Sequence, residues 1–66
     1  MRRFQKYTYY ICKYYDNWND VSFLLIIRSE NFNKINKRLE SEDKTLMEKR
    51  MTYTFREAQI VRSMMH

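Results

Sequence analysis

Apolar and aromatic residues fill two early runs of the chain, residues 4–15 and 21–28, and occupy both alternating faces of each run. Aromatic and β-branched side chains favour a pleated backbone, and a strand covered on both sides, or central in a sheet, has this pattern. The residues between the runs, Asp16 to Asp20, read DNWND, and such side chains stabilise turns by bonding back to the backbone. The sequence therefore predicts two antiparallel strands joined by a short loop.

The spacing of apolar residues then changes from two to three and four, which predicts a helix over about residues 30–40. Ser29 stands where this helix would begin, and its hydroxyl can accept a bond from an orphan backbone N–H group. A polar break follows at residues 41–44, which read SEDK. The apolar residues of the predicted helix are Phe32, Ile35 and Leu39.

Residues 42–54 permit two interpretations. The run Thr-Tyr-Thr-Phe, which begins at Thr52, has strong β propensity, so a third, half-exposed strand is predicted at about 49–54. The competing interpretation is one long helix over 42–65, since this segment also contains good helix formers. Those helix formers are Leu46, Glu48 and Lys49.

The last segment carries a clearer signal. Residues 54–57 read TFRE, a capping box in which the Thr hydroxyl and the Glu carboxylate satisfy backbone N–H groups at a helix start. A helix is therefore predicted from residue 55 to about 65. Its inward stripe is predicted to consist of Ala58, Val61 and Met65, widened by Ile60 and Met64.

These elements predict one small α+β domain over residues 1–66, in the order ββαβα. The simplest two-layer arrangement is an antiparallel sheet with both helices packed on one face, which leaves the other face for another use. Tyrosines would lie on that free face. We expect them to be Tyr7, Tyr9 and Tyr15, or the alternate set Tyr10 and Tyr14.

A free aromatic face has several uses. RNA-recognition modules stack bases on such a face, but their glycine-containing motif is missing, because the chain has no glycine. The alternatives are burial in a homodimer, or a face that tolerates tyrosine because the hydroxyl stays wet. Trp18 in the loop likewise has two interpretations: it folds back onto the sheet, or it stands out as an interface anchor.

Charge favours acidic partners. Thirteen Lys and Arg residues against eight Asp and Glu give a net charge of +5, which suits nucleic acid, an anionic surface or an acidic protein patch. Lys34, Lys37 and Arg38 gather on the outer face of the first predicted helix. This basic ridge either meets phosphates or is a solvated helix face.

The chain lacks the residues that most catalytic mechanisms require. The single histidine is the last residue, His66, and the single cysteine is Cys12, which excludes a His-based nucleophile pair and a zinc site. Without glycine there is no phosphate-cradling loop, and the DNWND loop departs from a calcium-binding pattern. We expect no metal and no cofactor. We also expect no membrane segment, a buried and inert thiol at Cys12, and a location in the reducing cytoplasm of a host cell.

Composition indicates an origin. Phe, Tyr, Met, Ile, Asn and Lys are abundant, alanine occurs once, and glycine and proline are absent, which is the bias of AT-rich codons and suggests a phage or mobile element. The leading hypothesis is a non-enzymatic binding protein that inhibits or modulates a host protein or ribonucleoprotein by occupying its surface, as anti-CRISPR and other counter-defence proteins do. The alternatives are a nucleic-acid-binding regulator, as a monomer or a homodimer, and a metal-independent ribonuclease or toxin. The candidate partner-binding residues are Tyr7, Tyr9, Tyr15, Trp18, Lys34, Lys37 and Arg38.

Overall fold

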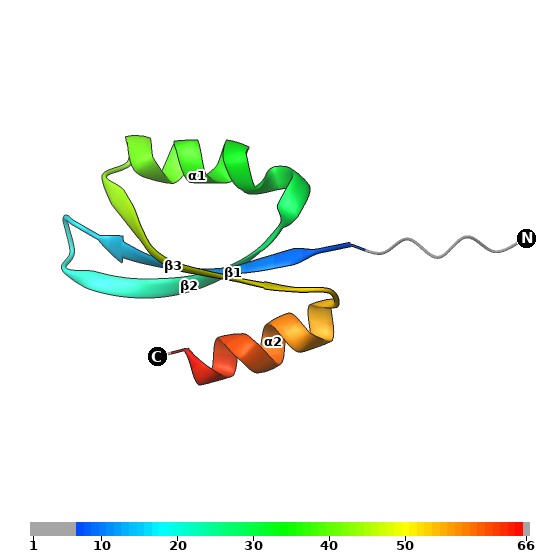
Figure 1. The fold of residues 1–66 in the computed structure, drawn as a ribbon. Coiled ribbons are helices and arrows are strands. Elements are labelled where there is room, and N and C mark those ends of the chain that lie inside the picture. Colours follow the sequence, from blue (N-terminus) through cyan, green and yellow to red (C-terminus); the bar gives the residue numbers. More distant parts are fainter. Residues whose placement is uncertain (1–6, 66) are drawn as a thin grey trace, which may run out of the picture.

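The computed structural model describes residues 7–65, in which a three-stranded antiparallel sheet lies between two helices (Figure 1). The strand order is β2-β1-β3, so β1 is central. The predicted α+β class and the ββαβα order are confirmed. The elements are β1 (Tyr9–Asp16), β2 (Val21–Arg28), the 3-10 turn η1 (Ser29–Asn31), α1 (Phe32–Ser41), β3 (Lys44–Thr52) and α2 (Phe55–Met64).

The prediction that both helices pack on one face is wrong, because α1 and α2 cover opposite faces of the sheet (Figure 1). Ile11 packs with Ala58 and Met65 on the α2 side. The next residue, Cys12, is also fully buried but packs on the α1 side, where Phe32, Ile35 and Leu39 cover it. Neighbouring residues of a strand point to opposite faces of the sheet, and both Ile11 and Cys12 are fully buried. Both faces therefore need cover, and each apolar face receives its own helix.

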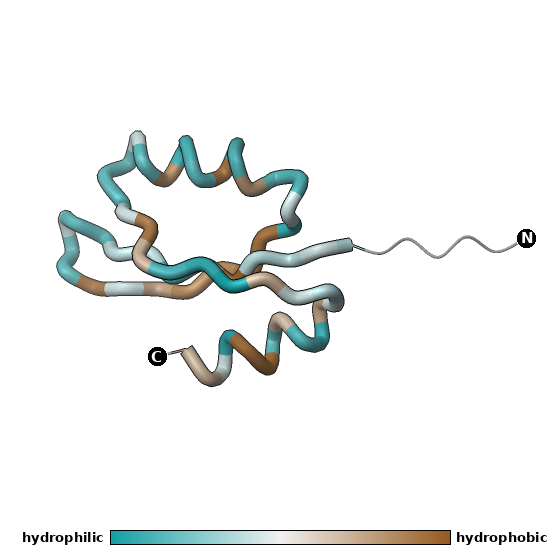
Figure 2. The backbone as a smooth tube through the Cα atoms, in the orientation of Figure 1, coloured by the Kyte–Doolittle hydropathy of each residue, from teal (hydrophilic) through white to brown (hydrophobic). Residues whose placement is uncertain are grey.

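β2 lies at an edge of the sheet, although its uninterrupted apolar run is also typical of a central strand. Its faces are covered, as predicted, since Leu24 and Ile26 pack toward α2 while Phe23 and Leu25 pack toward α1. Figure 2 shows the hydrophobic colouring of β2 against the mostly hydrophilic α1. The central strand is β1, which contains Lys13. Its predicted start was residue 4; β1 begins at Tyr9, and residues 4–6 lie outside the described residues.

The strand interpretation of the ambiguous segment is confirmed, and the long helix is wrong. β3 begins at Lys44, five residues earlier than predicted, and ends at Thr52. It pairs with the full length of β1, from Lys44 opposite Asp16 to Thr52 opposite Tyr9, and one bulge interrupts the pairing. Pairing with a whole neighbouring strand satisfies more backbone groups than the short strand that propensity alone outlines.

The two helices begin differently. Ser29 does not cap α1, because its hydroxyl bonds the Thr8 hydroxyl and η1 precedes the helix. The Thr54 half of the predicted capping box of α2 is present, since the Thr54 hydroxyl accepts a bond from the Glu57 N–H at 3.0 Å. The Glu57 carboxylate departs from the prediction, because it accepts from the Thr54 hydroxyl at 3.0 Å and not from a backbone N–H group. The inward stripe of α2 is narrower than predicted, since Ile60 and Met64 are exposed.

Candidate functional site

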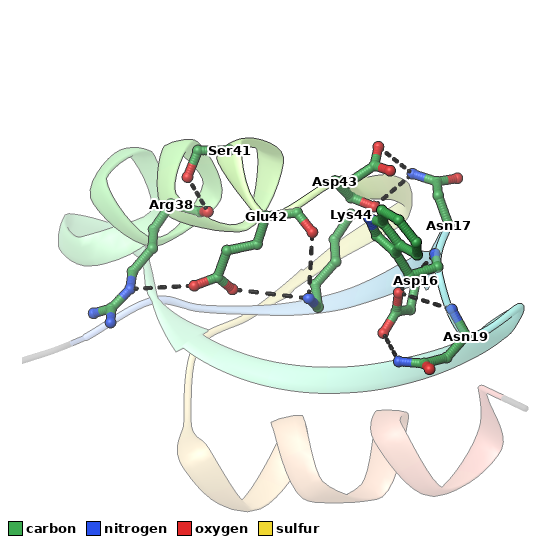
Figure 3. A network of polar contacts seen from close by, with 9 residues as sticks. Asp16, Asn17, Asn19, Arg38, Ser41, Glu42, Asp43 and Lys44 are labelled. Atoms are coloured by element: carbon green, nitrogen blue, oxygen red, sulfur yellow. Dashed lines mark hydrogen bonds and ion pairs between the residues drawn. The ribbon is translucent and has the colours of Figure 1, made fainter.

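The carboxylate of Asp16 organises the loop between β1 and β2. Its Oδ1 accepts from the backbone N–H groups of Trp18 at 3.0 Å and Asn19 at 3.2 Å, and its Oδ2 accepts from Asn19 Nδ2 at 2.8 Å (Figure 3). The Asp20 N–H closes the loop on the Asp16 carbonyl at 2.9 Å. Asp16 is the last residue of β1 and is itself buried. The sequence prediction of a turn held by Asn and Asp side chains is confirmed.

These bonds also set the ionisation of the loop. The Asn19 side-chain amide lowers the pKa of the Asp16 carboxyl most, and the backbone N–H groups of Asn19 and Trp18 and the charge of Lys44 add to the effect, while burial opposes it. A carboxylate that accepts several N–H bonds is stabilised in its charged form. The loop therefore keeps its anionic centre throughout the neutral pH range.

A second turn supports the first. Asn17 donates from Nδ2 to the Asp43 carbonyl at 2.7 Å and to Thr45 Oγ1 at 3.0 Å, and its backbone N–H bonds the same carbonyl at 3.2 Å. Asp43 belongs to the turn between α1 and β3, so the two turns lie side by side (Figure 3). Asp20 and Asp43 both adopt positive φ angles, 57° and 63°. In a chain without glycine, Asp is among the few residues that tolerate this conformation.

An ionic chain continues from the second turn to α1. Lys44 Nζ lies 3.8 Å from Glu42 Oε1, and Arg38 Nε lies 3.7 Å from Glu42 Oε2 (Figure 3). Such exposed pairs contribute little stability singly. Their arrangement places Arg38, one of the predicted partner-binding residues, at the same end of the molecule as the β1–β2 loop.

Trp18 stands out from this loop with 82% of its surface exposed. The interpretation that it folds back onto the sheet is wrong, and its role as an interface anchor stays a prediction. The exposed indole sits on a backbone that Asp16 fixes at Trp18 and at the following residue. A large amphipathic ring on a pre-ordered loop loses little entropy when it docks, which is the property of an efficient anchor.

The three predicted tyrosines do not form a free face. Tyr9 lies against Phe55 of α2, edge to face, with ring centroids 5.7 Å apart. The Tyr15 hydroxyl donates to the Asp20 carboxylate, and the Arg28 guanidinium lies 4.5 Å above the Tyr7 ring. The premise of an uncovered aromatic face is therefore wrong, because α2 packs on the face that carries Tyr9 and Tyr15.

The predicted basic ridge does exist as a geometric feature. Lys34, Lys37 and Arg38 are all exposed on α1, whose opposite side packs on the sheet. Whether this ridge binds phosphates stays a prediction. Cys12 is buried as predicted, and burial raises the pKa of its thiol to about 11, so thiolate chemistry is suppressed there.

Sequence reasoning missed a second group of exposed apolar side chains. The expected core positions of α2 and the alternation in β3 gave no sign that these residues would face solvent. The exposed apolar residues besides Trp18 are Val21, Met47, Met51, Tyr53, Phe55, Ile60 and Met64.

Among residues 7–65 no cluster of three or more His, Cys, Asp or Glu side chains could hold a metal ion, and no helix has the length and apolarity to cross a membrane.

In comparisons with known proteins, the chain matches no family model, no curated protein and no solved structure.

Proposed function

We propose that this protein is a small non-enzymatic binding protein of phage or mobile-element origin. It inhibits or modulates a host protein or ribonucleoprotein in the host cytoplasm by occupying its surface, in the manner of counter-defence proteins such as anti-CRISPRs. The observation that carries the proposal is Trp18, 82% exposed on a loop whose backbone is held by Asp16 and Asn17.

The physical argument starts from the exposure. A Trp ring in water forgoes the stabilisation of burial, roughly 25 cal/mol for each Å² of apolar surface. Nothing in the fold requires a Trp at this position, because the loop is closed by its neighbours' polar groups. An ordered, exposed Trp is the residue type most enriched at the centre of protein interfaces. The amino-acid bias typical of AT-rich codons supports the phage origin.

A nucleic-acid-binding regulator is the second candidate, and the exposed ridge of Lys34, Lys37 and Arg38 favours it. The distribution of charge counts against the ridge as the main binding surface. Arg2, Arg3 and Lys6 supply three of the thirteen basic residues, and no acidic residue stands among the first six. Ten basic and eight acidic residues remain in the rest of the chain, so that part is close to neutral. We therefore place the interface at Trp18.

Affinity capture from lysate of a low-GC bacterium tests the proposal, with the tagged wild type and the Trp18→Ala variant as baits. We expect wild type to retain a defined host protein that Trp18→Ala loses, with Kd raised about 30-fold or more, as for other anchor residues. Thermal unfolding of the two proteins should agree within about 0.5 kcal/mol, since the exposed ring contributes little to folding.

The matched control is Tyr53→Ala. Tyr53 is an exposed aromatic residue, at 62%, next to the end of β3 that pairs with Tyr9 and therefore far from the loop. It should bind like wild type. Equal capture by Trp18→Ala would contradict the anchor. Recovery of nucleic acid alone, with capture falling steeply as salt rises, would favour the second candidate.

A further inference from the structure

Within residues 7–65, no strand pairs with the outer edges of β2 and β3, and these two edges differ in how they are protected. β3 has four charged residues, Lys44, Glu48, Lys49 and Arg50, and a bulge, and both features discourage pairing with another strand. β2 has neither over its seven residues Val21–Ile27, which include no charge and no proline and pair with β1 without interruption. An unguarded apolar edge of this length is a template for another strand.

The backbone groups available on this edge follow from the hydrogen-bond pattern. The Ser29 N–H donates to the Thr8 carbonyl at 3.0 Å, and this pair continues the β1–β2 register one step past Tyr9 and Arg28. The residues at every second position from this pair are therefore the ones that exchange hydrogen bonds between β1 and β2. Because such pairs alternate in an antiparallel ladder, Val21, Phe23, Leu25 and Ile27 direct their backbone groups toward β1. Ser22, Leu24 and Ile26 direct theirs away from the sheet, toward the open edge.

We propose that β2 pairs antiparallel with β2 of a second copy of this chain, giving a six-stranded sheet with a two-fold axis at Leu24. In this register Ser22 lies opposite the second copy's Ile26, and Leu24 lies opposite itself, so the outward backbone groups of both strands meet. Phe23 and Leu25 lie opposite each other on the α1 side. Both faces of the junction are then apolar, and the whole run Val21–Ile27 is paired.

Charge selects this register. With Leu24 on the axis, Arg28, which forms an ion pair with Glu30 of its own chain, lies opposite Asp20 of the second copy. Both side chains belong to the face that α2 covers: Arg28 alternates with Leu24 and Ile26, and Asp20 accepts the hydroxyl of Tyr15, which lies on that face. Shifting the register by one step in either direction removes this opposite-charge pair. The isologous symmetry makes the contact twice.

The helices leave room for the second copy. α2 is centred on β1, whose Ile11 contacts Ala58 and Met65, and it also packs against Leu24 and Ile26 of β2. Three strand spacings, about 14 Å, separate the two β1 strands of the proposed sheet, which exceeds the helix diameter of about 10 Å. Within residues 7–65, a pocket of about 270 Å³ also opens beside the end of α2, next to β1 and β2. Its lining residues are Lys13, Ser22, Phe23, Leu24 and Met65.

Sedimentation equilibrium of the isolated full chain tests the dimer, and does so independently of any host partner. We expect twice the chain mass at micromolar to millimolar concentration. Ser22→Pro removes one outward N–H from an exposed position, where proline is tolerated at an edge. By symmetry two bonds are lost, so the dimer Kd should rise about 10- to 100-fold.

Met51→Pro is the matched control, because Met51 is exposed and alternates with the residues of β3 that bond β1. It should remain dimeric. In case proline disturbs folding, Leu24→Cys provides a second test: two thiols across the axis should form a disulfide-linked dimer on mild oxidation, while Met47→Cys on β3 should not. A monomeric wild type, an uncrosslinked Leu24→Cys, or equal dissociation of folded Ser22→Pro and Met51→Pro would overturn the proposal.

Discussion

At the scale of single residues, Asp16 links folding to the candidate interface. Its carboxylate accepts three bonds from the loop that carries Trp18, at 2.8 to 3.2 Å. The same bonds lower the pKa of the carboxyl. A group whose pKa is lower in the folded than in the unfolded state stabilises the fold above its unfolded pKa and loses this contribution as the pH falls through its folded value.

We therefore predict an acid dependence of stability that belongs to Asp16. The contribution is complete above the ordinary Asp pKa of about 3.9 and disappears as the pH falls below it. Urea unfolding between pH 2 and 7 should show a smaller loss at low pH for Asp16→Asn than for wild type. Asp43→Asn is the control. It removes a carboxylate that accepts one bond, from Asn17 at 3.3 Å, and Asn tolerates the positive φ of this position. An unchanged pH profile in Asp16→Asn would contradict the assignment.

At the scale of elements, each helix is placed by its packing, and only one has a strong local start. Thr54 closes the first turn of α2 with bonds to the Glu57 N–H and carboxylate, while the N-cap residue of α1, Asn31, makes no side-chain cap bond. α1 depends instead on its apolar side and on the bond from the buried Tyr14 hydroxyl to Asn36 Oδ1 at 2.8 Å.

Removal of the α2 cap should destabilise the protein. We expect Thr54→Ala to lower the free energy of unfolding by about 1 kcal/mol, within the usual range for a lost N-cap. Hydrogen exchange should speed up first at the amide of Glu57. Thr54→Ser, which keeps an acceptor at the same position, should restore most of the loss. Equal loss in the Ser and Ala variants would show that the hydroxyl bond is not the cause.

At the scale of the whole molecule, the sheet separates two hydrophobic clusters. One lies under α2 and contains Ile11 and Val61, and the other lies under α1 and contains Cys12 and Leu39. A chain of 66 residues buries little surface, so both clusters are needed for stability. Residues in different clusters share no packing partner in these groups, which makes their energies separable.

We predict that Leu39→Ala and Val61→Ala act additively. Each side chain is half-buried, so each change should cost about 1–2 kcal/mol, below the range for fully buried residues. The double variant should equal the sum within about 0.5 kcal/mol in chemical denaturation. A coupling energy above that limit would contradict independent clusters and would show that the strands transmit strain between the faces.

The sequence by itself determined most of the local structure. Runs of aromatic and β-branched residues predicted the first two strands, the DNWND loop predicted its own turn, and TFRE predicted the start of α2, because propensities, side-chain-to-backbone bonds and caps act over a few residues. Trp18 was identified as a candidate anchor from its place in the loop, and the structure added its exposure and the network beneath it.

Only the tertiary structure decided which neighbours these elements received. Each helix covers one of the two apolar faces that the assembled sheet presents, and the extent of β3 depends on the length of β1. The same holds for β2: its apolar run predicts burial, but only the strand order leaves its backbone edge open, because pairing partners are chosen by long-range packing that no local pattern encodes.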